Sequence, residues 1–346
     1  MQSIIEQLRR SLQTEITVFS RDAEDTKLRH KVERVVPARE LTREEVLPEI
    51  EKLDLFVLGG DILYDAEAKT YLREVELAHE KGIPVMTYAV GVGPLNDHNA
   101  QKLVRDTLYR ADVVTLRQRG DKKVLEEAGL EREITVTADP AFLLKPETLP
   151  KNALRHEHMS TGDRLVGISV REHGVAALDI DEDFYHGLLA NAADFMIDRF
   201  SADVEFVPME GRQLDVQHSH AVMAQMLRPQ RAWVLKETYT PGQLLTLMKY
   251  FDFAVGMRLH FLIFAALQEV PFVALPYSEK VSGLLNELHL SMPPMELVNA
   301  GQLLAYIDQS WDKRTSLKRK IKRHLPTLKK RALVTNKMAV DLLTKA

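Results

Sequence analysis

Short apolar runs alternate along most of the chain with longer segments of helical periodicity. Runs rich in β-branched residues predict strands at 15–19, 33–36, 54–60, 84–94, 113–116, 134–137, 164–171, 204–209, 232–235, 252–257 and 272–277. Apolar positions three and four residues apart predict helices at about 1–13, 42–52, 66–81, 97–110, 118–128, 182–200, 213–227, 241–250, 258–268 and 278–289. This alternation is typical of parallel sheets with helices on both faces.

One segment interrupts the alternation. Residues 145–163 contain two prolines, few large apolar side chains and mixed charges, which indicates a linker. We therefore expect an N-terminal α/β domain over 1–147, a C-terminal α/β domain over 164–311 and a basic helical tail over 312–346. The fold class is α/β, with two Rossmann-like parallel-sheet domains facing a cleft.

Composition mainly excludes classes of function. The net charge of −4, from 46 basic and 50 acidic residues, gives no reason to expect nucleic-acid binding. The chain has no cysteine, which excludes disulfides, thiolate catalysis and cysteine-ligated zinc. No apolar stretch approaches membrane-spanning length, and the opening MQSIIEQLRRSLQ lacks the features of a signal peptide. We expect a cytoplasmic protein.

The run GMRLHFLIFAAL, residues 256–267, carries the strongest chemical signal. Its helix is apolar after His260, yet its first turn holds Arg258 and His260. A buried guanidinium at a helix N-terminus suits a bound anion, and a histidine beside that anion suits proton transfer. The alternative is that Arg258 pairs with an acid of the protein and His260 is a core histidine. Arg171, after a neighbouring strand, favours a small anion, with Lys280 as a third cation.

Other strand ends offer weaker candidates. The glycines at 59–60 and 91–93 either approach a ligand or only make tight turns, and neither segment matches a nucleotide-binding motif. We expect no metal site. Further candidates for ligand binding are Gly59, Gly60, Asp61, Asp65, Arg117 and Glu210.

The tail combines basic and apolar positions. Lys318, Arg319, Lys322 and Arg323 share one helical face, and Ile321, Leu325 and Leu328 share another, while Pro326 is expected to break or kink the helix. One interpretation is a solvated helix that braces the protein body. The other is weak peripheral docking on an anionic membrane face.

Several segments, in order, resemble the polysaccharide pyruvyl transferase family, most closely its CsaB-type, cell-surface-anchoring branch. They are LFVLGGDILYD (55–65), YAVGVGPL (88–95), ADVVTLRQRGD (111–121), TADPAFLL (137–144), GISVRE (167–172), VEFVPM (204–209), FAVGMRLHFLIFAA (253–266) and PYSEKVSGLL (276–285). The family usually begins with a strand and a G-D-E loop, whereas this chain opens within the helix that follows them. Its glycine-rich turn is reduced here to Gly59, Gly60 and Asp61.

The resemblance implies a GT-B-like architecture and transfer of a pyruvyl group from phosphoenolpyruvate to a sugar, giving a 4,6-ketal. In the CsaB-type branch, the acceptor is an N-acetylmannosamine unit of a lipid-linked secondary cell wall polymer precursor, and the product anchors S-layer proteins. By this resemblance Arg171, Arg258 and Lys280 bind phosphoenolpyruvate and His260 is the catalytic acid/base. The resemblance also assigns the candidates Gly59, Gly60, Asp61, Asp65, Arg117 and Glu210 to the acceptor side. No cofactor is implied beyond the donor.

Two alternatives belong to other classes. A nucleotide-sugar glycosyltransferase of the same architecture needs carboxylates for the ribose, for which Glu210 and Glu237 are candidates. The other alternative is a non-catalytic glycan-binding relative, which needs neither phosphoenolpyruvate nor a nucleotide sugar. The sequence leaves the oligomeric state open.

Overall fold

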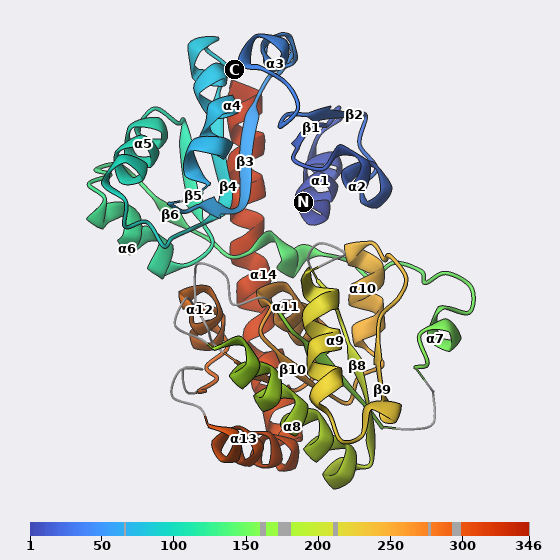
Figure 1. Cartoon of the computed structure of the whole chain (residues 1–346). Helices are drawn as coiled ribbons and strands as arrows, with labels where there is room; N and C mark the ends of the chain where they lie inside the picture. The colour runs from blue at the N-terminus through green and yellow to red at the C-terminus, as the bar shows by residue number, and fades with distance from the viewer. Residues whose placement is uncertain are drawn as a thin grey trace. The chain divides into compact units, whose positions relative to one another are not determined.

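The computed structural model describes residues 1–65, 67–159, 164–171, 181–209, 214–275, 278–292 and 299–345 (Figure 1). The chain divides into two compact units. Unit 1 comprises Met1–Leu144 with Thr327–Ala346, and unit 2 comprises Lys145–Pro326. Unit 2 therefore begins within the segment predicted as a linker, and the predicted tail is divided between the two units. Glu210 lies outside the described residues.

Unit 1 contains two parallel sheets. A two-stranded sheet pairs β1 with β2, and a four-stranded sheet has the order β3-β4-β5-β6. Its strands are β1 (Thr17–Ser20), β2 (Arg34–Pro37), β3 (Phe56–Leu63), β4 (Val85–Val92), β5 (Val113–Leu116) and β6 (Thr135–Val136). Its helices are α1 (Gln2–Ser11), α2 (Ala23–Arg29), α3 (Arg43–Ile50), α4 (Ala68–Glu80), α5 (His98–Tyr109), α6 (Arg119–Glu127) and the short 3₁₀ helix η1 (Pro140–Leu143).

The larger sheet of unit 1 is covered on both faces. Phe56 and Leu58 of β3 pack into one apolar cluster with residues of α3, α4 and α5. Leu55 and Val57 pack instead with Leu8 of α1. Successive strand residues thus point to opposite faces, as the pleat requires. This confirms the expected parallel sheet between helical layers.

Unit 2 contains one five-stranded parallel sheet of order β11-β10-β7-β8-β9. Its strands are β7 (Arg164–Ser169), β8 (Ala202–Phe206), β9 (Ala232–Val234), β10 (Phe253–Gly256) and β11 (Phe272–Ala274). Its helices are α7 (Ala153–His156), α8 (Glu182–Phe200), α9 (Val216–Gln225), the 3₁₀ helix η3 (Pro229–Arg231), α10 (Pro241–Met248), α11 (Leu259–Leu267), α12 (Glu279–Glu287) and α13 (Ala300–Asp312). This order is that of a doubly wound Rossmann-like sheet.

One local expectation was wrong, and so was the break that was one of two outcomes expected at Pro326. The glycine turn predicted at Gly59 and Gly60 is part of β3, which continues to Leu63 through register shifts against β4. Gly60 there has a φ of +109°, a region that favours glycine. The tail does not break at Pro326, because α14 (Arg314–Lys345) is one helix in Figure 1.

Burial on one face explains why α14 continues through its proline. Ile321, Leu325, Leu328 and Ala332 are all buried, so tertiary packing holds the helix on both sides of Pro326. Within the described segments, no helix combines the length and apolar character needed to cross a membrane.

Candidate functional site

The sheet order of unit 2 brings Arg171 and Arg258 to corresponding positions. Strand β10 pairs directly with β7, with Gly256 opposite Ser169, and each arginine follows its register partner by two residues. The chain runs from β7 to β8 and β9 on one side, then returns to place β10 on the other side. The boundary between β7 and β10 is therefore the topological switch point, where open α/β sheets bind ligands beyond their carboxyl ends.

Arg258 is buried and paired. Its Nε lies 3.1 Å from both carboxylate oxygens of Asp215, and its Nη2 also donates to Asp215 Oδ1. Asp215 is fully buried and accepts a further hydrogen bond of 2.9 Å from the backbone N–H of Met209. The pairing with an acid, one of the two readings that the sequence left open, is thus present. A two-point ion pair of this kind also fixes the orientation of the guanidinium.

Arg171 is positioned through its backbone. Its side chain is buried, and its carbonyl oxygen accepts a hydrogen bond of 2.9 Å from the hydroxyl of Tyr185. Tyr185 is itself fully buried in α8. Packing of α8 against the sheet therefore sets where the chain leaves β7.

The other donor-side candidates follow the same edge. His260 is exposed in the first turn of α11, where Leu259 and Phe261 are both buried. Lys280 is half-buried in the first turn of α12, which follows β11, and β11 pairs with β10. Arg171, Arg258 and Lys280 thus follow three adjacent strands.

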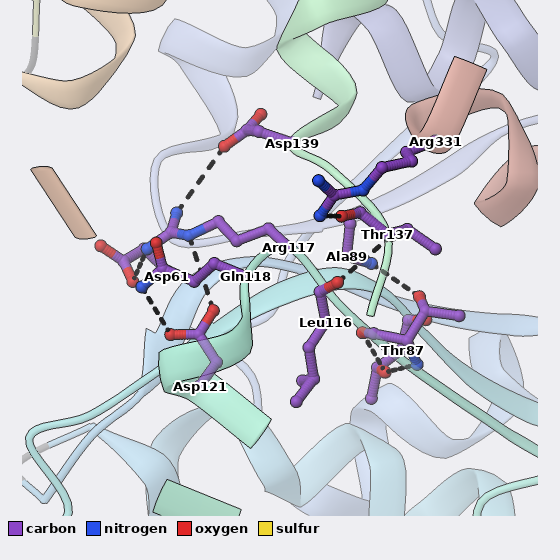
Figure 2. A network of polar contacts seen from close by, with 11 residues as sticks. Asp61, Thr87, Ala89, Leu116, Arg117, Gln118, Asp121, Thr137, Asp139 and Arg331 are labelled. Carbon is purple, nitrogen blue, oxygen red and sulfur yellow. Dashed lines mark hydrogen bonds and ion pairs between the residues drawn. The ribbon is translucent and has the colours of Figure 1, made fainter. Parts of the chain in front are cut away.

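In unit 1, Arg117 lies buried after β5 among three carboxylates (Figure 2). Its Nη2 donates to Asp61 Oδ1 at 2.7 Å, while its Nη1 is 3.8 Å from Asp139 Oδ2 and its Nε is 3.9 Å from Asp121 Oδ2. Burial raises the pKa of Asp121 to about 6, although the Arg117 charge opposes the shift. Asp61 retains 31% side-chain exposure, so this carboxylate is where the cluster reaches solvent.

A glycine makes room for this ion pair. A Cβ placed on Gly91 would lie 2.3 Å from Arg117 Nη2 and 2.4 Å from Asp61 Oδ1. Gly91 therefore makes room for an ion pair within the protein, a role different from the ligand contact and the tight turn that the sequence suggested for these glycines. Figure 2 also shows Thr87 near Ala89, away from the carboxylates around Arg117. The Oγ1 of Thr87 donates to the carbonyl oxygen of Thr115, where the β4–β5 register shifts.

The remaining acceptor-side candidates have surroundings that differ from those of the Asp61–Arg117 ion pair. Asp65 accepts backbone hydrogen bonds of 2.8 and 2.9 Å from Asn96 and Asp97, at the start of α5. Gly59 and Gly60 lie within β3, whose residue Asp61 contacts Arg117. The structure therefore joins Asp61 with Arg117 and gives Asp65 a helix-end contact.

Sequence reasoning missed several polar residues near the predicted site. Asp215, which holds Arg258, carries no local motif. Glu182 and His186 stand one helical turn apart in α8, and this spacing was a usable signal. With His218 of α9 they form a group whose ligand atoms lie within 4.8 Å of one another.

The comparisons with known proteins agree with this fold and with the motif order. A family model described as polysaccharide pyruvyl transferase matches residues 1–279. The amylovoran biosynthesis protein AmsJ of Erwinia amylovora is 21% identical over 300 residues, which are 83% of this chain and 71% of AmsJ.

Solved structures resemble the chain over almost its full length. The UDP-GlcNAc 2-epimerase of Neisseria meningitidis has a TM-score of 0.68 and 13% identity, covering 99% of this chain and 95% of its own. The Methanocaldococcus jannaschii enzyme has a TM-score of 0.67 and 15% identity, covering 100% and 97%. The trehalose-6-phosphate synthase OtsA has a TM-score of 0.57 and 11% identity, covering 99% and 84%. At such identities the likeness shows the fold alone, an α/β architecture with parallel sheets of the GT-B type.

Proposed function

Because this chain belongs to the polysaccharide pyruvyl transferase family, whose activity is pyruvyl transfer in polysaccharide biosynthesis, we propose that its unit 2 binds the donor phosphoenolpyruvate. The observation that carries the proposal is the placement of Arg171 and Arg258 at equivalent register positions on β7 and β10. Two guanidinium groups at a switch point suit a small, multiply charged anion. Lys280, after the next strand, supplies a third positive charge.

The reaction needs proton transfer as well as anion binding. A proton is added to the methylene carbon of phosphoenolpyruvate, giving a methyl group and positive charge at the neighbouring carbon. One sugar hydroxyl attacks that carbon, the carbon–oxygen bond to phosphate breaks, and the second hydroxyl closes the ketal. Each hydroxyl releases its proton, and the products are the ketal and inorganic phosphate.

The residues of unit 2 fit these steps. His260 is exposed two residues after Arg258, so its imidazole is accessible to deliver and collect protons. The arginines hold the donor and stabilise the phosphate as it leaves. Asp215 acts through Arg258, since its carboxylate fixes the guanidinium orientation.

For the acceptor, we assign the CsaB-type reaction: a 4,6-ketal on N-acetylmannosamine of a lipid-linked cell wall polymer precursor, used to anchor S-layer proteins. The resemblance to that branch supports this assignment. Asp61 and Arg117 are the acceptor-side residues that the geometry favours, because a partly exposed carboxylate accepts hydrogen bonds from sugar hydroxyls. Gly59, Gly60 and Asp65 remain neighbouring candidates on β3 and the segment after it.

The test is turnover with defined substrates. The protein is incubated with phosphoenolpyruvate and a synthetic lipid-linked disaccharide containing N-acetylmannosamine, and phosphate release and the ketal methyl signal are measured. An acceptor methylated at O6 is the matched control, because it cannot close the ketal. Phosphate with a 4,6-ketal supports the proposal. UDP release from UDP-sugars indicates a glycosyltransferase instead, and binding without turnover indicates a glycan-binding relative.

A further inference from the structure

Helices α8 and α9 pack together and bring a carboxylate and two imidazoles to one point. Glu182 begins α8, His186 follows one turn later, and His218 comes from α9. His218 Nδ1 lies 2.9 Å from His186 Nε2 and 3.1 Å from Glu182 Oε1. The His218 side chain is 11% exposed and that of Glu182 is 46% exposed, so the group is open to solvent on the Glu182 side.

Three polar atoms lie close to His218 Nδ1, and this nitrogen cannot form a hydrogen bond with all three. The Tyr185 hydroxyl is also within 2.8 Å of this nitrogen, and the same hydroxyl donates to the Arg171 carbonyl at 2.9 Å. A ring nitrogen carries either one hydrogen or one lone pair. Whichever it carries, at least one of its three polar contacts has no hydrogen between the atoms. A bound cation removes this conflict, because each lone pair then points at positive charge.

We propose that Glu182, His186 and His218 form a zinc-binding site. Two imidazoles and one carboxylate are a ligand set that zinc uses, with a further position left for water. Tetrahedral bonds of about 2.0–2.1 Å place ligand atoms about 3.3 Å apart. The two distances from His218 Nδ1, 2.9 and 3.1 Å, are close to this spacing, and all three ligand atoms lie within 4.8 Å of one another. Mg²⁺ and Ca²⁺ prefer oxygen ligands, so this site discriminates against both.

Zinc at this position would lie beside the donor machinery. Zinc takes the lone pair of His218 Nδ1, which leaves the Tyr185 hydroxyl to donate to the Arg171 carbonyl alone. Zinc also joins α8 to α9, the helix whose N-terminal residue follows Asp215. The ion thus fixes backbone that carries Arg171 and the partner of Arg258. The binding itself does not depend on the proposed pyruvyl transfer.

The experiment is zinc titration of the untagged, metal-free full chain by calorimetry, with thermal unfolding in parallel. We expect one zinc per chain and a raised unfolding midpoint, since a ligand of the native state stabilises it. His186→Ala and His218→Ala should each weaken zinc binding by more than the roughly 10–100-fold typical of lost outer contacts. His220→Ala, on the exposed face of α9, is the matched control and should bind as the unmodified protein does.

Glu182→Gln guards against misfolding, because the side chain is 46% exposed and glutamine keeps an oxygen that can accept a hydrogen bond. It should also weaken zinc binding while leaving the unfolding midpoint of the metal-free protein unchanged. The proposal is overturned if zinc does not bind, if it binds equally to all three ligand variants, or if Mg²⁺ binds as tightly as zinc.

Discussion

At the scale of single residues, the side chain of His260 is exposed, whereas its neighbours Leu259 and Phe261 in α11 are buried. His260→Gln removes a group able to exchange protons while leaving the buried side of the helix intact. We expect turnover to fall by about 10²–10⁴-fold, with a much smaller effect on phosphoenolpyruvate binding. Steady-state phosphate release and donor calorimetry measure the two effects separately. Near-normal turnover in this variant would remove His260 from the mechanism.

Glu205 is a buried carboxyl in β8 with a large effect on stability. Burial, reinforced by the charge of Glu157, raises the pKa of Glu205 to about 9 from an ordinary value of 4.5. The folded state therefore keeps a proton that the unfolded state loses. The contribution of Glu205 to stability is therefore complete below pH 4.5 and is lost as the pH rises towards 9.

Glu205→Gln should remove this pH dependence, because an amide does not ionise. Between pH 6 and 8 the difference in unfolding free energy, variant minus unmodified protein, should increase by about 1.4 kcal/mol for each pH unit. Urea unfolding at several pH values measures the difference. Glu237→Gln, an exposed change nearby, is the control and should show a constant difference. A constant difference for Glu205→Gln as well would contradict the raised pKa.

Gly91 tests the close packing of the Arg117 cluster. In Gly91→Ala the added methyl group would overlap the side-chain ends of Arg117 and Asp61, and the buried Arg117 guanidinium would have to shift away from its carboxylates. We expect a loss of about 1–3 kcal/mol in the free energy of unfolding. Gly301→Ala is the control, since its nearest atom would be 3.5 Å away, in ordinary contact. Equal stability of the two variants would show that the ion pair relaxes freely.

At the scale of elements, strands were easier to predict from sequence than the junctions between them. Each predicted strand exists, because apolar β-branched runs bury on both faces of a parallel sheet. The prediction of a turn at Gly59 and Gly60 was wrong. Strand β3 accommodates extra residues through register shifts against β4, and no local sequence pattern indicates such shifts. Pro326 did not break α14, since burial of Leu325 and Leu328 outweighs the lost hydrogen bond.

The arrangement of the elements also determines which site residues could be predicted from the sequence. Arg171 and Arg258 were identifiable because they follow strands, and strand ends of a parallel sheet share one edge. Asp215 and Tyr185 were not, because their roles arise from contacts between segments 43 and 14 residues apart. Such partners are set by tertiary packing and not by local pattern.

Helix α14 carries the proposal of membrane docking. Its cations Lys318, Arg319, Lys322 and Arg323 are exposed, and Lys318 and Lys322 approach Glu269 at 3.9 and 3.2 Å. The apolar side chains of Ile321, Leu325 and Leu328 are buried in the protein, so the proposed docking is that of the four cations. Each cation near an anionic surface contributes about 1 kcal/mol, and salt screens the effect.

We expect weak co-sedimentation with anionic vesicles at low salt that disappears at high salt. Changing the four cations to glutamine should abolish it, whereas changing four acidic residues elsewhere on the surface should not weaken it. Equal pelleting with neutral and anionic vesicles, or an unaffected glutamine variant, would leave α14 as a structural brace.

At the scale of the whole molecule, the account depends on one statement: unit 2 is the donor-binding unit of a pyruvyl transferase. The fold alone cannot decide this, since the similar structure of the Neisseria meningitidis epimerase holds UDP-GlcNAc. The decisive feature is local, namely the two arginines beyond β7 and β10. A direct measurement of donor binding therefore tests the account better than the fold does.

That measurement is calorimetric titration of phosphoenolpyruvate into the unmodified chain, Arg171→Ala and Arg258→Ala. Because Arg258→Ala strands the buried Asp215, the double variant Arg258→Ala/Asp215→Ala is titrated beside it, and thermal unfolding verifies each fold. Arg231→Ala, which breaks an arginine–aspartate pair elsewhere in unit 2, is the control. We predict a loss of affinity of about ten- to hundredfold for each site arginine and none for the control. Unchanged affinity in folded variants of both arginines would contradict the account.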